Sequence, residues 1–157
     1  YVLLRHVNPF EDSNLTEATI HEHYTAHLTN GLGNLVARVM KLAEDYLPHP
    51  VALTNAEGKI EDAFSNHVEA FRFSEAMDFV FAKVAAADAF MTAHAPYTKI
   101  QSSDTVEQKT ARKDIEYLVR QLASIAAHLA PAMPQTAAAI MTTVCANKKP
   151  NNLFPRI

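Results

Sequence analysis

The chain has 157 residues, which fits one domain and is enough to bury a hydrophobic core. Hydrophobic residues make up 48% of the chain and charged residues 20%, the balance of an ordinary globular protein. The net charge of −3 excludes nucleic-acid binding through overall basicity, so any RNA contact would need a local basic patch. No hydrophobic run approaches the roughly 20 residues that a membrane span needs, so we expect no membrane partner.

The chain begins with Tyr1 rather than methionine, which favours a segment of a longer protein. Its single cysteine, Cys145, cannot form an internal disulfide, which favours a reducing compartment such as the cytoplasm. We expect Cys145 to be a buried structural residue, because no residues that would activate a nucleophile surround it.

The first 15 residues favour an extended or loop-like segment because turn-forming residues are dense in them. These are Asn8, Pro9, Asp12, Ser13 and Asn14.

A long amphipathic helix is expected after Thr16, which suits an N-cap, with Glu17 at the positive end of the helix dipole. Hydrophobic residues then recur every three or four positions as far as Pro48. They are Ile20, Tyr24, Leu28, Leu32, Leu35, Val39, Leu42 and Tyr46. Such a helix would be about 45 Å long.

The middle of the chain shows a turn at residues 55–58, a short helix at 59–71 with Phe71 on its apolar face, and a helix capped by Ser74. The last of these ends before Pro96, since the residue preceding a proline disfavours the α conformation. A polar loop at residues 97–104 should follow.

Two further helices are predicted, one ending before Pro131 and one beginning near Pro134, which suits a first-turn proline. Residues 147–157 are rich in Asn, Lys and Pro and should lack regular structure. Three hydrophobic residues of this tail can dock it on the core: Leu153, Phe154 and Ile157. The predicted fold is all-α, an up-down bundle of four to five helices at residues 16–146.

Histidines raise the question of a metal site, because His23 and His27 lie one helical turn apart and His21 and His23 flank Glu22. Such a site needs further ligands on a facing helix, and no His-Glu-x-x-His pattern is present. We therefore expect solvated or capping histidines and no metal site, with three further histidines scattered singly: His67, His94 and His128. No Walker loop, dinucleotide fingerprint or Gly-x-Ser-x-Gly elbow occurs, so we expect no catalytic centre in this chain.

Gly31 and Gly33 lie inside the long helix, where each costs about 1 kcal/mol relative to alanine. Two explanations for these glycines are open. Either another helix packs closely against the long helix here, or a ligand approaches its backbone. Asn34 and Arg38 follow at i, i+4 spacing and project from one helix face. An amide and a guanidinium placed side by side can read the edges of nucleic-acid bases, and an ordinary polar surface explains the pair equally simply.

Tyr97 follows Pro96 just past the end of a predicted helix, so its ring is held on a loop. A ring in this position is a candidate stacking platform for an unpaired base. Alternatively, it packs over the end of its own helix.

Taken together, five segments resemble the methionyl-tRNA synthetase family in order and in approximate separation, across nearly the whole chain. They are residues 1–15 (YVLLR and PFEDSNL), 33–38 (GNLVAR), 95–97 (APY), 129–134 (LAPAMP) and 153–157 (LFPRI). The family has Trp at the position of Tyr97 and Phe at that of Ala132.

This resemblance implies the C-terminal anticodon-binding bundle of a class I synthetase. Residues 1–15 would then link the bundle to a missing catalytic domain, which would use ATP and magnesium to join methionine to its tRNA. Asn34, Arg38 and Tyr97 would read the CAU anticodon, with the first base stacked on the aromatic ring. The chain alone would bind tRNA and its own catalytic domain but would be inactive.

Two alternatives stay open. The first is the equivalent bundle of another class I synthetase, such as those for valine, isoleucine, leucine or cysteine. The second is a helical protein-interaction module that binds no RNA, with Tyr97 and Arg38 at the centre of its interface.

Overall fold

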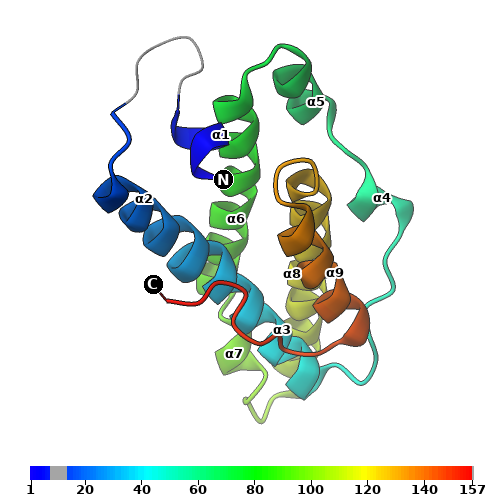
Figure 1. Cartoon of the computed structure of the whole chain (residues 1–157). Helices are drawn as coiled ribbons and strands as arrows, with labels where there is room; N and C mark the ends of the chain where they lie inside the picture. Colours follow the sequence, from blue (N-terminus) through cyan, green and yellow to red (C-terminus); the bar gives the residue numbers. More distant parts are fainter. Residues whose placement is uncertain (8–13, 157) are drawn as a thin grey trace.

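The computed structural model describes residues 1–7 and 14–156, and every regular element within them is a helix (Figure 1). This confirms the all-α prediction. The first long helix is continuous and comprises α2 (Glu17–His23), η1 (Tyr24–Gly33) and α3 (Asn34–Tyr46). The other long helices are α6 (Phe73–His94), α8 (Thr105–Leu129) and α9 (Pro134–Ala146), and the short ones are α1 (Val2–His6), α4 (Asn55–Gly58), α5 (Asp62–Glu69) and α7 (Pro96–Lys99). None of the described helices is long and apolar enough to cross a membrane.

The helices α6, α8 and α9 run in alternating directions, and residues 47–72, which carry α4 and α5, return the chain to the end where α6 begins (Figure 1). The centre of the bundle is α8, which packs against α3, α6, α7 and α9. Its inward face is fully buried and includes Ile115, Leu118, Leu122, Ile125 and Leu129. These are the hydrophobic residues whose spacing predicted the helix.

The long first helix begins where the sequence predicted. The hydroxyl of Thr16 accepts the backbone N–H of Thr19, and the Thr19 hydroxyl accepts the backbone N–H of Thr16 in return. This reciprocal pair satisfies two backbone donors that the helix leaves unpaired at its start.

The middle of this helix differs from the prediction, because Tyr24–Gly33 form a π-helix rather than an α-helix. A π-turn carries more residues than an α-turn, so the helix downstream is rotated relative to a straight α-helix. The buried face of α3 runs through Leu35, Val36, Val39, Met40 and Ala43, and Leu42 and Tyr46 of the predicted stripe are only partly buried.

Several predicted boundaries were wrong. The lead-in is partly helical, since Val2–His6 form α1; the turn formers at positions 8, 9, 12 and 13 lie outside the described residues, as does Ile157. Residues 55–58 form α4, and the helix predicted at 59–71 is limited to α5. Phe71 is 66% exposed with φ 56°, beyond the end of α5. Arg72, not Ser74, is the N-cap of α6.

Cys145, predicted to be buried, is exposed, because it faces away from the buried side of α9 that carries Ile140 and Val144.

His128, expected to be solvated or to cap a helix, is fully buried in α8. Its Nε2 accepts the backbone N–H of Glu61, the residue that precedes α5, at 3.1 Å. The other nitrogen, Nδ1, therefore carries the proton and donates to the Ser124 carbonyl at 2.8 Å. The ring also meets Phe64 edge-on, with centroids 5.2 Å apart. One buried imidazole thus joins the start of α5 to the bundle.

The C-terminal tail begins at Asn147, which has left-handed backbone angles and caps two helices at once. Its own backbone N–H closes α9, and its side-chain amide donates to the Ala43 and Leu47 carbonyls at the end of α3, both at 3.2 Å. We expect Asn147→Gly, which keeps the left-handed conformation but removes the amide, to lower the free energy of unfolding by about 1 kcal/mol. Asn147→Ala should lower it further, since it also strains the backbone. Urea unfolding followed by circular dichroism measures both, and equal losses would contradict a role for the backbone angles.

Candidate functional site

A groove of about 480 Å³ lies between α3, α6, α7 and the C-terminal tail. All three site residues that were predicted from the sequence line this groove. Asn34 and Arg38 come from α3, and Tyr97 comes from α7. The remaining lining residues are Ala37, Lys41, Leu42, Met91 and Lys149. Every charged side chain in this lining is basic, although the chain as a whole is acidic. The charged side chains that line this groove are therefore of one sign.

Asn34 is the first residue of α3 and follows directly on the π-helix. Its backbone N–H donates to the carbonyl of Thr29, five residues earlier, which marks the last π-turn. Its side chain is exposed, and one turn later Arg38 is half-buried on the same face. The amide and the guanidinium are therefore presented side by side, as the spacing predicted.

Arg38 is held by a carboxylate on the facing helix. Its Nη1 donates to Asp88 Oδ1 on α6 at 2.9 Å, with 39% of the arginine side chain and 53% of the aspartate side chain exposed. An ion pair this exposed contributes about 0–1 kcal/mol, so a ligand can compete for the guanidinium. Because Asp88 uses one edge of the guanidinium, the pair also orients the remaining N–H groups.

Tyr97 lies on a short helix, which corrects the prediction that its loop is irregular. Ala95 adopts left-handed angles (φ 44°, ψ 52°) at the end of α6, and Pro96 then starts α7 at its first position. The Tyr97 side chain is 44% exposed and lines the groove beside Met91. No ring among the described residues stacks on it. One aromatic face is thus available over the groove.

Two lysines accompany Arg38. Lys41 donates to Asp45 at 2.7 Å, and this contact raises the pKa of the ammonium group, which keeps it charged. Lys149 belongs to the tail, where its backbone N–H donates to Glu44 at 3.1 Å. Lys99, at the end of α7, is not among the lining residues. The sequence analysis did not identify Lys149, because only the docking of the tail places it beside α3.

A second cavity of about 450 Å³ adjoins the groove and shares Asn34 and Ala37 with it. Its other walls are the end of η1 and the tail: Thr29, Asn30, Gly33, Asn151, Asn152, Leu153, Phe154 and Arg156. Asn34 therefore lines both the groove, whose charged residues are basic, and this second cavity, which is rich in side-chain amides. The asparagines of the tail are the part of this surface that the sequence analysis left without a role.

The tail also explains Gly33. A Cβ atom there would lie 3.0 Å from Phe154 Cδ2 and 3.1 Å from the Leu28 carbonyl oxygen, so a side chain would displace the tail. The tail crosses the long helix at this point (Figure 1), where the Tyr24 hydroxyl donates to the Pro155 carbonyl at 2.8 Å. Gly33 is thus explained by close packing, with the tail rather than with another helix. A Cβ atom on Gly31 would lie 3.3 Å from the Ala26 carbonyl oxygen of η1 itself.

No family model and no curated protein matches the sequence. Solved structures do match. The whole chain superposes on 38% of Mycobacterium tuberculosis methionyl-tRNA synthetase in its free state, with a TM-score of 0.82 and 19% sequence identity. The fold is that of part of methionyl-tRNA synthetase. The same enzyme bound to methionyl-adenylate matches 99% of the chain at TM-scores of 0.82 and 0.80, again at 19% identity.

This likeness agrees with the resemblance read from the five sequence segments, and at this identity it concerns the fold. The chain spans about 38% of the length of that synthetase.

Proposed function

We propose that this chain is the anticodon-binding module of a methionine–tRNA ligase and that the groove around Asn34, Arg38 and Tyr97 binds the CAU anticodon loop. The observation that carries the proposal is the meeting of these three residues, from two separate helices, in a groove whose charged lining is basic. The fold supports it independently, because the whole chain superposes on part of a methionyl-tRNA synthetase.

The groove offers what recognition of unpaired RNA bases requires. Bases of a loop are splayed out, stacked on aromatic or guanidinium planes, and hydrogen-bonded at their edges. Tyr97 supplies an open ring, Asn34 a donor and an acceptor, and Arg38 a planar donor group held by Asp88. Lys41 and Lys149 line the same groove and would contact the backbone phosphates of a bound loop; such contacts position the RNA without reading its sequence.

The parent protein would then join methionine to its tRNA with ATP and magnesium, using a catalytic domain in cis.

The test of the proposal is the affinity of the chain for an anticodon stem-loop, with Tyr97 varied. Tyr97→Ala should weaken binding about 5- to 150-fold, the loss expected from removing one base–aromatic stack. Tyr97→Phe should bind like the wild type, since it keeps the ring, and Tyr97→Trp should bind as tightly or more tightly. Fluorescence anisotropy with a labelled stem-loop measures these affinities.

Salt dependence separates this proposal from a protein-interaction groove. Binding that neutralises phosphates weakens steeply as salt is added, whereas an apolar protein contact does not. An affinity for the stem-loop that changes neither with the salt concentration nor with the loss of the Tyr97 ring would contradict the proposal.

A further inference from the structure

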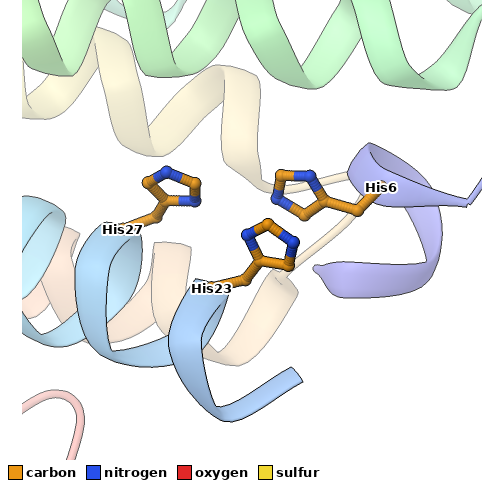
Figure 2. A group of neighbouring side chains, drawn as sticks. All are labelled: His6, His23 and His27. Atoms are coloured by element: carbon orange, nitrogen blue, oxygen red, sulfur yellow. The ribbon is translucent and has the colours of Figure 1, made fainter. Parts of the chain in front are cut away.

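Three histidines from two separate segments meet on the side of the bundle where α1 packs. His6 ends α1, His23 ends α2, and His27 lies one turn later in η1 (Figure 2). One ring nitrogen from each lies within 4.8 Å of the other two, and all three side chains are half-buried. The sequence showed the pair His23 and His27 but no ligand from a facing helix. The structure supplies that ligand from α1.

From this convergence we propose that His6, His23 and His27 bind a divalent transition-metal ion, of which Zn²⁺ is the best fit. Imidazole nitrogen is a preferred ligand of zinc, and three protein ligands plus a water complete a tetrahedral site. Zinc–nitrogen bonds of about 2.0–2.1 Å place tetrahedral ligand atoms about 3.4 Å apart. The ligand nitrogens lie within 4.8 Å of one another, and the His6 and His23 rings must turn out of their parallel stack to direct their nitrogens at one ion.

The three rings lie close together and nearly parallel. His6 and His23 stack face to face, with centroids 3.7 Å apart and planes within 6°. The His27 ring lies 5.5 Å from His6 and 5.7 Å from His23, with planes within 19° of theirs. The three side chains therefore form one compact group.

A second layer of contacts orients two of the rings, as is usual around bound zinc. The Tyr1 hydroxyl lies 3.1 Å from His6 Nε2 and 2.5 Å from His27 Nδ1. Arg5 donates to the same oxygen at 3.0 Å, so this oxygen accepts one further N–H and gives its own proton to the other ring. The ring that donates to Tyr1 keeps a lone pair for the metal, whereas the nitrogen that accepts from Tyr1 would bind the metal in place of the hydroxyl. The positive charge of Arg5 is countered by Asp78, 2.8 Å away.

Metal binding would tie α1 to the α2–η1 helix. None of the three histidines lines the groove of Tyr97, although His27 lines a neighbouring cavity of about 340 Å³ that also reaches Asn34 and Arg38. The proposal does not depend on the proposed function. Its expected effects are metal affinity and greater thermal stability of the chain.

Titration of the metal-free chain with Zn²⁺ by calorimetry tests the proposal. We expect one ion per chain and a melting temperature that rises with Zn²⁺ and falls back with a chelator. Removing a ligand with His23→Ala or His6→Asn should weaken binding at least about 100-fold, since even indirect partners contribute 10- to 100-fold. His49→Ala, which removes an exposed histidine outside the cluster, should bind as the wild type does.

Cobalt provides a second measurement, which reports coordination of the ion by the histidines and does not depend on the stability of the fold. Co²⁺ bound by the three imidazoles should give the intense visible absorption of a tetrahedral site in the wild type and in His49→Ala, and not in His23→Ala. Binding that is lost equally in His49→Ala and His23→Ala, or no binding at millimolar Zn²⁺, would overturn the proposal.

Discussion

Replacing Arg38 with alanine is expected to weaken binding of the anticodon stem-loop about 5- to 150-fold while leaving the bundle folded. The guanidinium is the one group in the groove lining with a planar fork of N–H donors on separate nitrogens, so its removal costs the 1–3 kcal/mol typical of a bidentate contact to a base or a phosphate. Stability should change by less than about 1 kcal/mol, because the ion pair to Asp88 is half-exposed on both sides. Anisotropy with the stem-loop and urea unfolding measure the two effects separately.

The control for this variant is Asp88→Ala. It breaks the same ion pair but keeps the guanidinium in the groove, and it removes a negative charge that competes with RNA for Arg38. Its affinity for the stem-loop should equal or exceed that of the wild type. If Asp88→Ala and Arg38→Ala lost affinity equally, Arg38 would act through the ion pair and not through contact with RNA.

Replacing His128 with alanine is expected to have the largest effect on stability among the polar residues, about 3–5 kcal/mol. The substitution leaves a cavity between Phe64 and Phe79 and leaves the Glu61 N–H without its partner. It also removes a second hydrogen bond from the Ser124 carbonyl, which keeps its helical one. Such a loss is a large fraction of the 5–15 kcal/mol by which a domain is usually stable. Chemical unfolding followed by circular dichroism gives the value.

His128→Gln supplies the matched comparison, because its side-chain oxygen can accept the Glu61 N–H in place of Nε2. It should recover part of the loss, whereas the exposed His49→Ala should stay within about 0.5 kcal/mol of the wild type. A loss below about 1 kcal/mol in His128→Ala would show that the buried hydrogen bonds do not hold α5 to the bundle.

Periodicity predicted the long helices well, because each has a buried stripe whose spacing is visible in the sequence. It placed the Thr16 cap, the end of α6 near Pro96 and the start of α9 at Pro134 correctly. It could not show the π-helix, since an extra residue per turn leaves no signature in a stripe of Tyr24, Leu28 and Leu32 at four-residue spacing. It also missed α1, whose residues carry no buried side chain and no cap.

The candidate groove was predicted in part. The i, i+4 spacing is enough to put Asn34 and Arg38 on one face, and the position of Tyr97 after Pro96 marked it as a candidate stacking residue. The resemblance joined the three residues into one predicted site. Their meeting in one groove depends on how α7 folds back beside α3, which is a tertiary contact without local sequence signal. Lys149 was missed for the same reason. His6 and His128 illustrate the same limit. They are isolated histidines in the sequence, and they acquire specific partners only when the helices pack.

Anticodon recognition is tested most directly by a chemical-shift titration of the labelled chain with two RNA stem-loops at low salt. One carries CAU in its loop and the other has the first of these bases changed. We predict that the shifts concentrate at Asn34, Arg38 and Tyr97. We also predict that the CAU loop produces these shifts at a lower RNA concentration than the altered loop does. Shifts that spare this groove, or that are identical for the two loops, would contradict recognition of the anticodon by these residues.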